Sequence, residues 1–168
     1  PTLEAQSDLR VVNETTTSIA VMQINAVMEP FNDPRVRQAL NLAVDRAGTV
    51  KALFPTLPGG TDSLPTNVPA ATTHWASAGN KVVYDPDKAK SLLAEAGYPN
   101  GIDMPFCVVA ADQTSQDAFN LYQAQLAKVG IRATVELQPS IGACNEAAKA
   151  GKYASIVAGI GGFPDQYL

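Results

Sequence analysis

The sequence has 168 residues, a formal net charge of −4, 46% hydrophobic residues and 17% charged residues, which is the composition of a globular domain and not of a disordered chain. Its 12 basic residues are scattered, which argues against a phosphate-neutralising surface for nucleic acid, and no apolar run reaches the roughly 18 residues that a membrane-spanning helix needs. Two cysteines and one histidine exclude a zinc site built from Cys and His alone.

The first 18 residues are polar and rich in threonine, and they predict an irregular lead-in. They contain no initiator Met and neither the basic nor the apolar region of a signal peptide, so we expect the chain to be a piece of a longer protein. From residue 19 the sequence IAVMQIN is mainly apolar and β-branched, which predicts a buried strand.

The next segment carries a strong helix start. Asp33 can cap a helix and Pro34 suits the first helical position. The apolar residues that follow fall on one face as far as Ala47, which predicts a single helix over this stretch. Residues 54–83 are rich in proline and glycine, and they predict a long loop of the kind that is functional or spans an interface.

Strand and helix patterns alternate through the second half of the chain. A capped helix begins at Asp85-Pro86 and stops at Gly97. The following elements are a strand over 105–110, a helix from Thr114 or Ser115 to Gly130, a strand over 131–137, a weaker helix over 141–150 and a strand over 153–157. This order predicts an α/β fold with a mixed, partly parallel sheet flanked by helices.

The two cysteines leave two alternatives open. Cys107 lies in a predicted core strand and Cys144 at the start of a predicted helix. In an exported protein they can form one disulfide, whereas buried free thiols are equally common in protein cores. The choice depends on whether the two Cα atoms lie within about 7 Å of each other.

Motifs for catalysis are missing from the sequence. It contains no G-x-S-x-G, Walker, H-E-x-x-H or C-x-x-C pattern. The glycines at 159–162 fail the dinucleotide spacing, and only six residues follow them, so they predict no nucleotide site. His74, beside Trp75, has no evident acid or nucleophile partner and is interpreted as a surface or packing residue. We expect a protein that is not an enzyme and has no cofactor and no metal site.

Three stretches carry a family resemblance. Residues 20–46 contain AVMQIN and PFNDPRVRQALNLAVDR, residues 84–101 read YDPDKAKSLLAEAGYPNG, and residues 123–131 read QAQLAKVGI. In this order they resemble the signatures of the solute-binding proteins of dipeptide, oligopeptide and nickel ABC importers, extracellular solute-binding protein family 5. Members of that family are longer and bilobal, and they enclose the ligand between two lobes.

The resemblance implies that residues 19–168 form most of the second, ligand-binding lobe of a periplasmic-binding-protein-like fold, with 1–18 near a hinge. The implied function is non-enzymatic capture of a small-molecule or peptide solute by hinge closure, followed by docking on the importer permease. The implied partners are the solute, the permease and the first lobe of the same full-length chain, without nucleic acid. The implied location is periplasmic or extracytoplasmic, with membrane association through the transporter or through a lipoprotein anchor outside this chain.

The sequence leaves two other classes of protein as alternatives. A ligand-sensing domain of a regulatory or signalling protein would have a DNA-binding segment or transmembrane helix elsewhere in its full-length sequence. An α/β hydrolase or transferase would need a nucleophile and a base, which the sequence does not reveal.

The predicted binding segment follows the last strand. Residues 158–165 resemble the family segment GWxADYPDP, and matching Phe163-Pro164-Asp165 to YPD places Gly162 where peptide-binding members have an Asp that pairs with the ligand ammonium. A buried ammonium without a counter-charge is costly, so an anionic, neutral or partly apolar solute is favoured over a peptide. Asp165 is interpreted as a turn or hinge residue, with a shifted counter-charge as its alternative role. The predicted ligand-binding residues, described as one adjoining wall, are Asn25, Gly159, Ile160, Gly161, Gly162, Phe163 and Asp165.

Overall fold

The computed structural model describes residues 19–53 and 83–160. The predicted lead-in at 1–18, residues 54–82 of the predicted loop and residues 161–168 lie outside the described residues. The elements in chain order are β1 (Ile19–Ile24), α1 (Pro34–Ala43), α2 (Arg46–Leu53), α3 (Pro86–Glu95), β2 (Ile102–Val109), α4 (Gln113–Ala127), β3 (Ile131–Gln138), α5 (Ile141–Lys149) and β4 (Ser155–Ile160).

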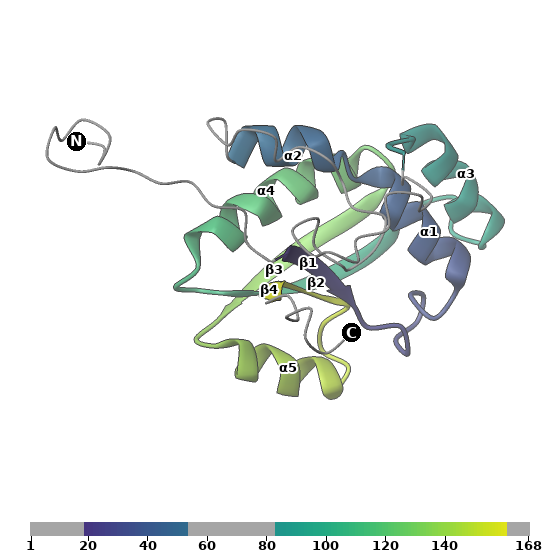
Figure 1. Cartoon of the computed structure of the whole chain (residues 1–168). Coiled ribbons are helices and arrows are strands. Elements are labelled where there is room, and N and C mark those ends of the chain that lie inside the picture. Colours follow the sequence, from purple (N-terminus) through teal and green to yellow (C-terminus); the bar gives the residue numbers. More distant parts are fainter. Residues whose placement is uncertain (1–18, 54–82, 161–168) are drawn as a thin grey trace, which may run out of the picture.

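The strands form one mixed sheet in the order β1-β4-β2-β3 (Figure 1). β2 runs parallel to β3 and to β4, while β1 runs antiparallel to β4. Parallel neighbours need crossover connections, and α4 and α5 supply them, from β2 to β3 and from β3 to β4. The α/β class and the mixed sheet predicted from the sequence are confirmed.

The two helices with an Asp-Pro start begin where the sequence predicts. Asp33 accepts a hydrogen bond from the backbone N–H of Arg35 at 2.8 Å, and Asp85 accepts one from Lys88 at 2.9 Å. Each carboxylate therefore satisfies a donor that the first helical turn leaves unpaired. Arg35 also pairs with Asp33 at 2.6 Å and donates to the carbonyl of Glu95 at the end of α3, which joins α1 to α3.

The single helix predicted as far as Ala47 is wrong, because the chain breaks between α1 and α2. Val44 is extended, with φ −104° and ψ 115°. The carboxylate of Asp45 accepts from the N–H of Gly48 at 2.9 Å and starts α2, while Arg46 donates to the carbonyl of Asn41 at 2.9 Å. The extended backbone at Val44 therefore ends α1, and Asp45 caps the start of α2, although the apolar stripe continues through this break.

Other predicted boundaries also move. β2 begins at Ile102, three residues before the predicted strand, and β4 runs from Ser155 to Ile160 instead of ending at residue 157. Gly159 and Ile160 consequently belong to a strand and not to the loop predicted after it. α4 begins at Gln113, because Asp112 is the residue that caps it.

Two unequal cores hold the layers together. The larger core lies between α1, α3, α4 and one face of the sheet, and includes an edge-to-face contact of Phe106 with Phe119 at a centroid distance of 5.2 Å. The smaller core lies under α5 on the other face and consists of Cys107, Cys144, Tyr153 and Ile156. Among the described elements, α5 alone covers that face (Figure 1). No helix in the described ranges is both long and apolar enough to cross a membrane.

Candidate functional site

A cavity of about 700 Å³ lies between α5 and the β1–β4 strand pair. Its volume is within the range of roughly 300–1,000 Å³ that is usual for small-molecule sites. The lining comes from the end of β1, the exposed side of α5 and the start of β4: Gln23, Ile24, Asn25, Val27, Gly142, Asn145, Glu146, Ala148, Lys149, Tyr153, Ala154, Ser155 and Ile156.

Asn25 connects two walls of this cavity. It directly follows β1, and its backbone N–H donates to the carbonyl of Ala154 at 2.9 Å. Its side-chain Nδ2 donates to the carbonyl of Ala148 near the end of α5 at 3.0 Å, and its Oδ1 accepts a long bond from Val27 at 3.4 Å. An amide oxygen has two acceptor positions, so Asn25 keeps hydrogen-bonding capacity for a bound molecule.

Most of the lining surface is apolar, and its polar side chains are together close to neutral. Gln23, Asn25 and Asn145 contribute amides, and the charges of Glu146 and Lys149 face each other in an ion pair at 2.8 Å. These two charged side chains are about three-quarters exposed, at 75% and 73%, so their pairing contributes little to stability. Among the described lining residues, Glu146 is the only carboxylate, and a cation already accompanies it.

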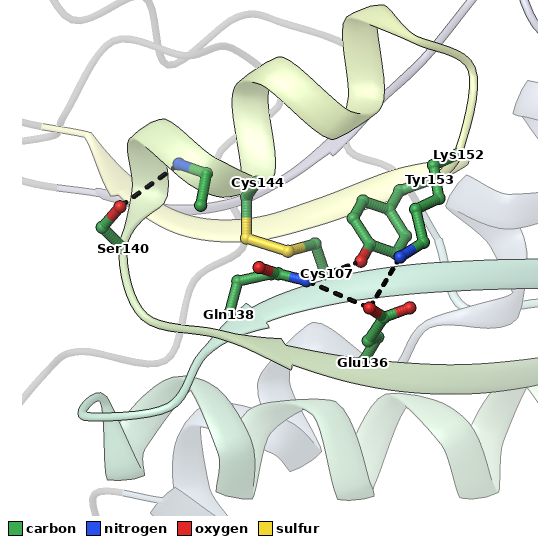
Figure 2. Close-up of a disulfide and its surroundings, with 8 residues drawn as sticks. Cys107, Glu136, Gln138, Ser140, Cys144, Lys152 and Tyr153 are labelled. Atoms are coloured by element: carbon green, nitrogen blue, oxygen red, sulfur yellow. Dashed lines mark hydrogen bonds and ion pairs between the residues drawn. A yellow bond between two sulfur atoms is a disulfide. The ribbon is translucent and has the colours of Figure 1, made fainter.

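A hydrogen-bonded cluster fixes Tyr153 at the edge of the cavity (Figure 2). Gln138 Nε2 donates to the Tyr153 hydroxyl at 3.0 Å and to Glu136 at 3.1 Å, while Lys152 bonds Glu136 at 2.7 Å. The hydrogen bond from Lys152 is the main reason why the pKa of Glu136 is lowered, and the same bond raises the pKa of Lys152. The cluster links β3 to the segment between α5 and β4.

A disulfide joins α5 to the sheet. The sulfur atoms of Cys107 in β2 and Cys144 in α5 are bonded, their Cα atoms are 5.7 Å apart, and both residues are completely buried. Figure 2 shows the bond running from the underside of α5 to the strand beneath it. Of the two alternatives that the sequence left open, the structure contains the bridge.

The structure separates the predicted site residues. Gly159 pairs with Ala20 and Ile160 with Ile19, whereas Ser155 pairs with Ile24, the neighbour of Asn25. At about 3.3 Å per residue, Ser155 and Gly159 are roughly 13 Å apart. Antiparallel pairing thus puts Gly159 and Ile160 at the opposite end of the ladder from Asn25, and the ligand-binding role of these three residues stays a prediction. The other predicted residues, Gly161, Gly162, Phe163 and Asp165, lie outside the described residues.

The sequence reasoning also overlooked lining residues. Gln23 lies two positions before Asn25, so strand alternation places both on one face. Asn145 and Lys149 are four residues apart on a helix, which places them on one side of α5. Both signals are present in the sequence, but neither shows that the two faces meet.

The fold is an α/β lobe with a cavity beside α5. The sequence model of the bacterial extracellular solute-binding proteins, family 5 Middle, matches residues 1–167. The chain therefore belongs to this family, which is a solute-binding family and not a family of enzymes. The resemblance inferred from the sequence motifs is confirmed.

Relatives with known names or structures agree with this assignment. The glutathione-binding protein GsiB of Escherichia coli (strain K12) is 34% identical over 133 residues, which cover 79% of this chain and 25% of that protein. The chain thus spans about a quarter of the length of the curated relatives it matches.

Two solved structures show the fold. The periplasmic binding protein DppA of Helicobacter pylori, in complex with the peptide STSA, superposes with a TM-score of 0.80 at 25% identity, covering 96% of this chain and 30% of that one. AgaA of A. tumefacien R10, in complex with agropinic acid, superposes with a TM-score of 0.73 at 31% identity, covering 88% of this chain and 30% of that one. Both are periplasmic binding proteins, and this chain matches part of each.

Proposed function

We propose that the chain is the second, ligand-binding lobe of an extracytoplasmic solute-binding protein that captures a small solute and delivers it to the permease of an ABC importer. The observation that carries the proposal is the cavity of about 700 Å³ beside α5 in a chain of this family. A first lobe of the same full-length protein closes over the solute, because contacts from both lobes favour the closed state. A buried disulfide fits an oxidising compartment outside the cytoplasm.

The proposed solute is neutral or anionic and forms hydrogen bonds. Amides dominate the polar part of the described lining, and Lys149 already accompanies Glu146. A solute that presented a free ammonium to this lobe would find no unpaired carboxylate among the described lining residues, and a buried unpaired charge is expensive. The relatives bind chemically different solutes, since GsiB is named for glutathione and AgaA holds agropinic acid.

The segment 159–165 belongs to the same proposal. β4 carries the chain from the cavity at Ser155 toward Gly159. We therefore assign Asn25 and the residues from Gly159 to Phe163 to different parts of one solute, with Asp165 in a turn or hinge contact. Asn25 supplies an amide, while the glycines at 161 and 162 offer backbone N–H groups and Phe163 an aromatic face.

Thermal-shift measurements on the full-length protein test this function. The panel contains agropinic acid, together with glutathione and dipeptides in free and N-acetylated forms, because glutathione also carries a free ammonium. We expect stabilisation by agropinic acid or by a peptide whose N-acetylated form stabilises the protein at least as well as its free form. We expect this thermal shift to disappear in both Asn25→Ala and Phe163→Ala. Stabilisation by free dipeptides that disappears in Asp165→Ala would refute the inferred solute class, and unchanged binding in both other variants would refute the site.

A further inference from the structure

The helix that forms one wall of the cavity is held by very little apolar surface. α5 has the sequence IGACNEAAK, and Cys144 is its one buried residue. Ala147 and Ala148 pack only partly against the small core, and Ile141 remains 42% exposed. The buried part of α5 is therefore mainly the sulfur bridge itself.

Apart from the Ser140 cap, the hydrogen bonds from α5 to neighbouring residues lie near its C-terminal end. Asn25 donates to the carbonyl of Ala148 at 3.0 Å, and the N–H of Lys152 donates to the carbonyl of Ala147 at 2.9 Å. The helix has nine residues, whereas isolated helices shorter than about 12–15 residues are marginal in water. Without an anchor to the sheet, α5 has neither the packing nor the length to persist.

The disulfide supplies that anchor from the middle of the sheet. β2 lies between β4 and β3, and Cys107 pairs with Glu136 on one side and Ile156 on the other. Its neighbour Val108 is fully buried in the larger core. The bond thus connects a weakly packed helix to the central strand.

We propose that the Cys107–Cys144 disulfide positions α5 as a wall of the cavity, and that breaking the bond releases α5 while the larger core stays folded. A dithiol breaks it by supplying two electrons and two protons, which yields two cysteine thiols and the disulfide of the reductant. Both cysteines are completely buried, so the reductant reaches the sulfur atoms only after α5 has moved. Reduction therefore follows the opening of the helix.

Hydrogen exchange resolved to individual amides in the full-length protein tests this. In Cys107→Ala/Cys144→Ala, the amides of α5 should lose protection by about tenfold or more, which corresponds to about 1.4 kcal/mol, because the variant removes the buried bridge that holds the helix on the sheet. The amides of α4 should change little. Val108→Ala is the matched control, because it perturbs the same strand from the other core and should not loosen α5 selectively. Unchanged protection of α5, or equal loss in α4 and α5, would overturn the proposal.

A second experiment uses the wild-type protein, so it needs no variant. The protein is reduced by a dithiol, and its free thiols are then alkylated and counted by mass analysis. The two thiols should appear together, with exchange of the α5 amides and with the α4 amides still protected. Cooperative unfolding of the whole chain on reduction would overturn the proposal. One arm rests on the proposed function: a solute without a thiol, such as agropinic acid, should slow reduction if it stabilises the protein. Selective release of α5 without such slowing would count against the proposed solute site and not against the tether.

Discussion

Two glycines with positive φ allow a matched test of the tight approach between β2 and β3. Gly101 has φ +83°, and a Cβ atom there would overlap the backbone carbonyl of Gly130. That carbonyl accepts the N–H of Ile102 at 3.2 Å where the two strands begin. Gly97 has φ +97°, and a Cβ atom added there would have nothing within 4 Å. Gly97→Ala therefore measures the backbone conformation alone, and Gly101→Ala adds the steric conflict.

The expected magnitudes follow from these surroundings. Placing alanine in the left-handed region costs about 1–2 kcal/mol, which is the whole effect expected for Gly97→Ala. At Gly101 the strands must also separate, which adds about 1–3 kcal/mol of overpacking strain. For a domain of this size, 1 kcal/mol lowers the Tm by roughly 2–4 °C, so the two variants should differ clearly.

Urea unfolding of the 168-residue chain, followed by circular dichroism, measures the difference. Gly151→Ala serves as a second control, since Gly151 has φ +77° and also has nothing within 4 Å. We expect the free energy of unfolding to fall most in Gly101→Ala and by a similar, smaller amount in the two controls. Equal losses in all three variants would refute the close approach of Gly101 to Gly130.

Three further predictions address the cap, the core and the single lobe. Hydrogen bonds from the Ser115 side chain and backbone lower the pKa of Asp112. The stability that Asp112 contributes is therefore present above its unfolded pKa of about 3.9 and is lost as the pH falls through the lower folded pKa. Asp112→Asn should flatten the acid side of a stability–pH curve from urea unfolding, and an unchanged curve would contradict this. Phe106→Ala should cost about 3–5 kcal/mol in the same assay, because Phe106 is fully buried against Phe119; a loss below about 1 kcal/mol would show that the larger core does not depend on this pair. The 168-residue chain alone should unfold cooperatively but bind solute far more weakly than the full-length protein by calorimetry, and submicromolar binding by the chain alone would argue against a two-lobe clamp.

The helix starts were predictable because their signals are local. Asp33-Pro34 and Asp85-Pro86 place a capping carboxylate and a preformed φ next to each other, and both helices begin there. Asp45 is also a capping residue, but the apolar stripe of α1 continues through Val44, so the sequence pattern does not indicate that the helix is interrupted there. Apolar periodicity reports which face is buried and not whether the backbone continues through it.

The site was only partly predictable, because it depends on pairing between distant segments. The alternation in β1 places Gln23 and Asn25 on one face, and the sequence supports that much. The register of β1 against β4 is set by the folded sheet, and it puts Asn25 beside Ala154 and far from Gly159. The bond between Cys107 and Cys144 likewise depends on how α5 crosses the sheet.

Calorimetric titration of the full-length protein with the solute that stabilises it tests the solute site most directly. Asn145 lies on α5 and lines the cavity, so Asn145→Trp fills the space in which the solute is proposed to bind. Asn120→Trp is the matched control, because Asn120 is an exposed asparagine on α4 and does not line the cavity. We expect Asn145→Trp to lose affinity at least tenfold while its Tm stays unchanged, and we expect Asn120→Trp to keep wild-type affinity. Wild-type affinity in Asn145→Trp would contradict this expectation.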